Sequence, residues 1–154
     1  MKKLVIYLVI PLTIIVFAFI TKWWYVLVID GTDVILTGFP LPFVCPGFHT
    51  SMSLQIFILE FVVDLLTYFI AIFLLIFFID KFIMKIKVHR AMTIALYGLC
   101  GLIMSVSGLL AADSNNLFFL SRPFDIEIMD SGYQFTWQKL AHPDYYKYHP
   151  EKRK

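Results

Sequence analysis

The chain has 154 residues, of which 60% are hydrophobic and 16% are charged, and its formal net charge is +2. An average soluble domain is about 45–50% apolar and about 25% charged, so a chain of this length cannot hide so much apolar surface in a core. Composition and charge therefore exclude a water-soluble enzyme, a disordered chain and a nucleic-acid-binding protein, and they predict an integral membrane protein.

The first expected transmembrane helix covers residues 1–21. Lys2 and Lys3 precede a long apolar stretch, as in a secretory signal. Residues 17–21 lack a small-x-small cleavage pattern, so we expect a retained signal anchor. Pro11 is acceptable there, because other groups in a helical bundle can satisfy the backbone atoms that proline leaves free.

Residues 22–53 are expected to form an outer loop with a β-hairpin over 25–37. Two β-branched-rich runs flank Asp30-Gly31, a favoured turn pair, although an extension of the first helix through Ile29 is a competing interpretation. Three prolines and two glycines in 38–49 exclude regular structure. The apolar residues among them favour contact with the bilayer interface or with a partner protein.

The second and third expected transmembrane helices cover 54–80 and 92–112, joined by a basic cytoplasmic loop, 81–91. Cations near the span ends gather at the start of the chain and in this loop, whereas only Lys22 and Arg122 lie near the opposite ends. The bias predicts a cytoplasmic N-terminus and an extracytoplasmic C-terminus. Residue usage and the absence of an N-glycosylation acceptor favour a bacterial inner membrane.

The tail, residues 113–154, is expected on the outer side with a second β-hairpin over 125–138 and a turn at Asp130-Ser131-Gly132. A lone hairpin is marginal in water, so the two outer hairpins are expected to pack together. The predicted fold class is a membrane α-helical protein, with three transmembrane helices and a small extracytoplasmic β-hairpin cap.

Glu60 and Asp64 are the intramembrane polar candidates, and their spacing places them on one face of the second helix. Ionisable groups inside a span suggest an ion or proton path. Counting back from Asp80 places Glu60 at the outer interface and Asp64 roughly 6 Å deeper. We therefore favour the interpretation in which Glu60 reaches water and Asp64 hydrogen-bonds a partner helix or a cap residue.

Two sets of residues are expected to make packing or partner contacts. Small residues on one face of the third helix permit close approach of another helix. The helix-packing face consists of Gly98, Gly101, Ser105 and Gly108. Aromatic residues of the outer segments are the partner-contact candidates, namely Phe43, Phe48, Phe135, Trp137, Tyr145 and Tyr146.

No motif in the sequence indicates chemistry, so no catalytic residue, metal or cofactor is expected. Cys45 and Cys100 are expected at different depths and unpaired. The expected function is an accessory or assembly subunit of a larger membrane complex, bound to another membrane protein or to a second copy. One alternative is a transport component using Glu60 and Asp64. The other is an enzyme at the outer interface, in which His49 and these two acids would act as acid and base.

Overall fold

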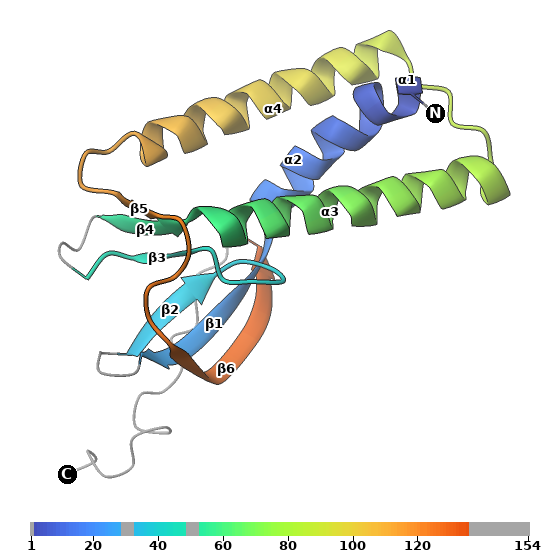
Figure 1. Cartoon of the computed structure of the whole chain (residues 1–154). Helices are drawn as coiled ribbons and strands as arrows, with labels where there is room; N and C mark the ends of the chain where they lie inside the picture. The colour runs from blue at the N-terminus through green and yellow to red at the C-terminus, as the bar shows by residue number, and fades with distance from the viewer. Residues whose placement is uncertain (1, 29–32, 49–52, 136–154) are drawn as a thin grey trace.

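The computed structural model describes residues 2–28, 33–48 and 53–135. Three long helical segments extend to one side of a six-stranded sheet (Figure 1). The first is continuous through α1 (Lys2–Leu4), the π-helical turn η1 (Val5–Val9) and α2 (Ile10–Phe19). The second joins α3 (Ile58–Phe78) to the π-helical turn η2 (Ile79–Ile83), and the third is α4 (Arg90–Ala111).

The sheet has the strand order β5-β4-β3-β2-β1-β6, and all neighbours are antiparallel except β4 and β5. It is larger than the expected hairpin cap. Its strands come from the segment between α2 and α3 and from the segment after α4: β1 (Ile20–Val28), β2 (Asp33–Thr37), β3 (Val44–Pro46), β4 (Leu54–Phe57), β5 (Leu117–Phe119) and β6 (Ile126–Phe135).

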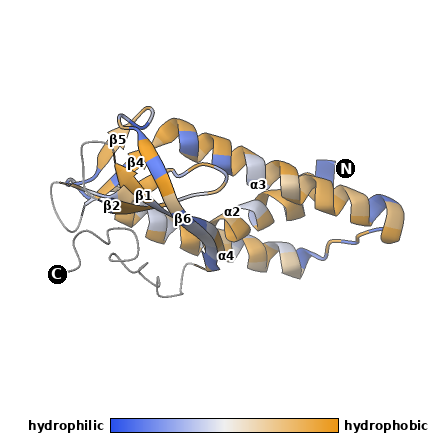
Figure 2. Ribbon diagram, turned by 90° about the horizontal axis from the view of Figure 1, so that it is seen from below, coloured by the Kyte–Doolittle hydropathy of each residue, from blue (hydrophilic) through white to orange (hydrophobic). Residues whose placement is uncertain are grey.

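The three helical segments are long and apolar enough to cross a membrane, with 18, 26 and 22 residues. Their apolar side chains face outward: at most 17% of the most apolar window of any segment is buried inside the protein. Figure 2, coloured by hydropathy, shows hydrophobic residues along most of the length of these helices. Such surfaces suggest membrane association, because water would disfavour this much exposed hydrocarbon.

The boundary of the second helix differs from the prediction. Leu54–Phe57 is strand β4, and the helix runs from Ile58 through Ile83. Burial alternates along β4, with Gln55 and Phe57 buried. This period of two belongs to a strand, and pairing with β3 and β5 supplies its backbone hydrogen bonds. The apolar content of these four residues alone suggested the helix.

The hairpin expected over 25–37 is present, since β1 and β2 pair antiparallel with Tyr25 opposite Ile35. The first strand begins earlier than expected, at Ile20, directly after α2. The turn residues Asp30 and Gly31 lie outside the described residues. The outcome also favours the hairpin over the competing extension of the helix.

The prediction of a hairpin over 125–138 is wrong for residues 125–135, the part that the structure describes. Ile126–Phe135 is a single strand along β1. Tyr25 faces Asp130 but Val26 faces Ile128, so Met129 is the extra residue of a β-bulge. Gly132 gives room to Trp23, whose ring would lie 2.9 Å from an added Cβ. The turn-like residues thus serve a bulge and a tight packing contact.

The stretch 38–49 was expected to lack regular structure, and this is wrong for Val44–Pro46, which forms β3. This strand contributes Cys45 to the core of the sheet, where it is buried with neighbours from β1, β2 and β4: Val26, Val28, Val34, Leu36 and Phe57. A separate apolar cluster at the far end of the helices includes Leu8, Val9 and Ile76.

Pro11 is accommodated by the π-helical turn and by α4. Ile10 donates its N–H to the carbonyl of Val5, five residues back. The next bond of this pattern would come from Pro11, which has no N–H, to Ile6. The Tyr97 hydroxyl of α4 instead donates to the Ile6 carbonyl at 2.6 Å, and Cys100 Sγ contacts the Pro11 carbonyl at 3.3 Å. Side chains of the neighbouring helix α4 thus donate to the backbone carbonyls around Pro11, as expected.

Candidate functional site

The candidate site lies where the start of α3 meets the loop after β2. Asp64 is fully buried, and both of its carboxylate oxygens accept backbone hydrogen bonds. Phe39 N donates to Oδ2 at 2.5 Å, and Leu41 N donates to Oδ1 at 2.9 Å. A carboxylate that accepts two amide N–H groups holds a turn firmly, because bonds to a charged acceptor are stronger than neutral ones. We call residues 38–43 the clamp loop.

The clamp loop is also fixed to the sheet. Gly38 N donates to the Lys22 carbonyl at 2.9 Å, and the Gly38 carbonyl accepts from Trp24 Nε1 at 2.8 Å. At its other end, Phe43 N donates to the carbonyl of Thr37 at 3.0 Å. The loop thereby joins β1 and β2 to α3 through Asp64. A hydrogen bond between Asp64 and a residue outside the helices is one of the two roles that the favoured interpretation gave it.

Glu60 lies one helical turn before Asp64, and its environment is different. Its Oε1 accepts from the backbone N–H of Arg122 at 3.1 Å, which ties the segment before β6 to α3. Its Oε2 is buried and has no hydrogen-bond partner among the described residues. The expectation that Glu60 reaches water is therefore wrong for this oxygen, because the segment around Arg122 covers the first turn of α3.

Tyr68 continues the face of α3 that carries Glu60 and Asp64. Its hydroxyl donates to the carbonyl of Ile20, the first residue of β1, at 2.8 Å. Its ring contacts Phe17 edge-on at 5.4 Å. The sequence analysis missed Tyr68, although the same spacing of four residues extends from Asp64. It also missed Gly38 and Arg122, which no local pattern relates to α3.

A set of aromatic contacts surrounds the clamp loop. The ring of Phe43 stacks on that of Phe17 in α2, with 5.5 Å between the ring centroids. It also meets the ring of Phe61 in α3 edge-on, with 5.4 Å between the centroids. Phe39 contacts Tyr133 of β6 at 5.4 Å. Phe43, one of the partner-contact candidates, thus packs on rings of its own chain and is half-buried. Partly buried aromatic contacts here join helices, loop and sheet.

The other partner-contact candidates have different outcomes. Phe48 is 45% exposed and contacts Phe124 at 5.7 Å. Phe135 is 41% exposed at the end of β6. Trp137, Tyr145 and Tyr146 lie outside the described residues.

The expected helix-packing face is open within the described chain. A Cβ added at Gly98, Gly101 or Gly108 would meet no atom within 4 Å. Ser105 is exposed, and its hydroxyl bonds only the carbonyl of Gly101 in its own helix, at 2.8 Å. The contacts of α4 with the first helical segment use a different side, which includes Cys100 and Leu96. We call the four small residues the small-residue face.

Both cysteines are free and buried. Burial in the sheet raises the pKa of the Cys45 thiol to about 11, so at neutral pH this group is the protonated thiol, which is a poor nucleophile. His49, an acid/base candidate in the enzyme alternative, lies outside the described residues. Among residues 2–28, 33–48 and 53–135, no three His, Cys, Asp or Glu side chains gather as metal ligands.

Comparisons with protein-family models, with curated proteins and with solved structures give no match for this chain.

Proposed function

We propose that this protein is a multi-pass integral membrane protein that serves as an accessory or assembly subunit of a larger membrane complex. The observation that carries the proposal is the open small-residue face of α4. In lipid, apolar surface alone does not drive helices together, and association depends on close backbone packing at small residues. A face of this kind that the described part of the chain leaves uncovered suits a helix from another membrane protein.

The proposed orientation places the N-terminus in the cytoplasm of a bacterial cell and the sheet outside its inner membrane. In support, the cations Lys3, Lys81 and Arg90 belong to the helix ends opposite the sheet (Figure 1). Cationic residues are retained on the cytoplasmic side of spanning segments. The clamp loop would then hold the outer sheet against the helices at the extracytoplasmic interface.

A second candidate function is an ion or proton path, and one observation favours it. Glu60 Oε2 is buried without a hydrogen-bond partner among the described residues, which is costly for a carboxylate. Against this, both oxygens of Asp64 are engaged by the clamp loop. The path would therefore depend on Glu60 and on helices contributed by a partner.

The proposal predicts that Gly101→Leu weakens recovery of the partner. A leucine side chain on the small-residue face would separate the two helix backbones, and we expect a loss of at least about tenfold, or about 1.4 kcal/mol. The measurement is quantitative pull-down of the tagged full chain from native membranes in mild detergent. Ser107→Leu is the matched control, because Ser107 is exposed and its spacing places it on another side of the same helix.

Equal partner recovery by wild type, Gly101→Leu and Ser107→Leu would refute the role of this face. A monodisperse monomer with no co-purifying protein would refute the subunit function. Recovery of only a second copy of the chain would replace the larger complex by a homo-oligomer. An intact complex in Glu60→Gln that has lost a pH-dependent flux would favour the ion path.

A further inference from the structure

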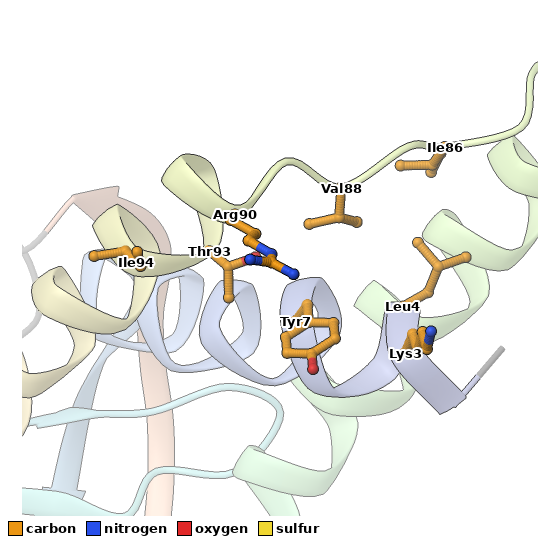
Figure 3. A pocket seen from close by; sticks show the side chains of 8 residues that line it. All are labelled: Lys3, Leu4, Tyr7, Ile86, Val88, Arg90, Thr93 and Ile94. Carbon is orange, nitrogen blue, oxygen red and sulfur yellow. The ribbon is translucent and has the colours of Figure 1, made fainter.

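A cavity of about 710 Å³ lies at the end of the helices opposite the sheet. Its walls come from three segments far apart in sequence: the start of the first helix, the connection after η2 and the start of α4. The lining residues are Lys3, Leu4, Tyr7, Ile86, Val88, Arg90, Thr93 and Ile94. Figure 3 shows Arg90 extending from the start of α4 toward Tyr7, with Val88 and Ile86 along the connecting segment.

The charge of this cavity has one sign. Two of its lining residues, Lys3 and Arg90, are cations, and no lining residue is acidic. The acidic side chain of this region, Asp80, is engaged elsewhere, where its Oδ1 accepts from Ile86 N at 2.9 Å. An anion would therefore meet two cations and no competing carboxylate among the lining residues. Arginine is well suited to phosphate, because its guanidinium can donate two parallel hydrogen bonds.

Four of the eight lining residues of the cavity are aliphatic. Leu4, Ile86 and Val88 belong to the apolar cluster between the helices. Ile94 lines the cavity and is 72% exposed, so the apolar surface continues outward along α4. Free phosphate gains nothing from such walls, whereas the glycerol and the acyl chains of a lipid would cover them.

We propose that this cavity binds one anionic phospholipid, with its phosphate at Lys3 and Arg90 and its acyl chains along the exposed side of α4. The alternation of the connecting segment supports this arrangement. Ile86 and Val88 face the cavity and the cluster, whereas Lys85 and Lys87 are exposed and do not line it. Lys85 and Lys87 would therefore attract a membrane surface without contacting one particular lipid. Lys3 and Arg90 would hold the phosphate of the bound lipid.

The test is native mass spectrometry of the full chain in detergent, titrated with phosphatidylglycerol, phosphatidylcholine or inorganic phosphate. We expect one retained phosphatidylglycerol and weaker retention of phosphatidylcholine. The variant K3Q/R90Q is expected to lower the apparent affinity for phosphatidylglycerol roughly 10- to 30-fold. The matched control K85Q/K87Q removes the same charge from the same end of the protein and is expected to change it less than about threefold.

Equal losses in the two double variants would overturn the proposal in favour of diffuse surface attraction. Displacement of phosphatidylglycerol by millimolar inorganic phosphate, with no preference for the lipid, would assign the site to free phosphate. Unchanged binding in K3Q/R90Q would also contradict it. If that variant unfolds, the single variant R90Q, expected to lose roughly fivefold, provides the same test.

Discussion

Asp64→Ala is expected to destabilise the folded protein by about 3–5 kcal/mol. The substitution removes the buried Asp64 carboxylate and leaves the N–H groups of Phe39 and Leu41, whose bonds to it are partly buried, without an acceptor. Each unsatisfied donor costs about 1–3 kcal/mol. Because the same loop is bonded to β1 and β2, we expect the sheet to separate from α3 in the same transition. Denaturant unfolding of the full chain in mild detergent, followed by circular dichroism, measures the loss.

Two variants make this prediction specific to the acceptors. Asp64→Asn keeps one carbonyl oxygen and presents an NH₂ group to the second N–H donor, so an intermediate loss is expected. Glu60→Gln keeps an oxygen for the Arg122 N–H and should change stability by less than about 1 kcal/mol. If the free energy of unfolding of Asp64→Ala lies within about 1 kcal/mol of the wild-type value, the bonds between Asp64 and the clamp loop contribute little and their structural role is refuted.

Gly38→Ala is expected to cost more than about 3 kcal/mol. Gly38 has φ of +149°, a conformation that residues with a side chain rarely adopt. A Cβ there would lie 2.1 Å from the Leu41 carbonyl oxygen and 2.8 Å from Phe43 N, and both are backbone atoms of the clamp loop. The loop could not keep its bonds to Asp64, so the variant is expected to unfold early in the same assay or to fail to accumulate.

Gly98→Ala is the control for this substitution. No described residue outside the backbone of α4 lies within 4 Å of an added Cβ at Gly98, so this variant should be neutral, or more stable by up to about 1 kcal/mol through helix propensity. Wild-type stability of Gly38→Ala would show that the clamp loop tolerates another path, and would contradict the geometry described for it.

Part of this architecture follows from local sequence patterns. Long apolar runs predict the three helices, because hydrocarbon surface of that length requires an apolar environment. The β-branched runs around Asp30-Gly31 predict the first hairpin. The depth of Asp64, one turn below the end of a helix, predicts a bond to an outer residue. Which residue supplies that bond depends on where the proline-rich loop folds, and local pattern does not determine it.

The other features depend on pairing between distant segments. The residues Asp130-Ser131-Gly132 have the composition of a turn. Because β1 can pair along its whole length, from Ile20 to Val28, these residues form part of one bulged strand in place of a hairpin. Likewise β4 becomes a strand because β3 and β5 flank it. Propensity in a sheet depends strongly on such neighbours. The cavity near Arg90 also arises only when three separate segments meet.

The most direct test of the proposed threading is the sidedness of two introduced cysteines in intact bacteria expressing the full chain. Leu120 lies at the sheet end and is 74% exposed, and Lys85 is exposed in the connection before α4, whereas the native cysteines are buried. A membrane-impermeant maleimide should label Leu120→Cys in intact cells and Lys85→Cys only after permeabilisation. Labelling of both variants from the same side, or of Lys85→Cys alone in intact cells, would contradict the proposed threading of the chain.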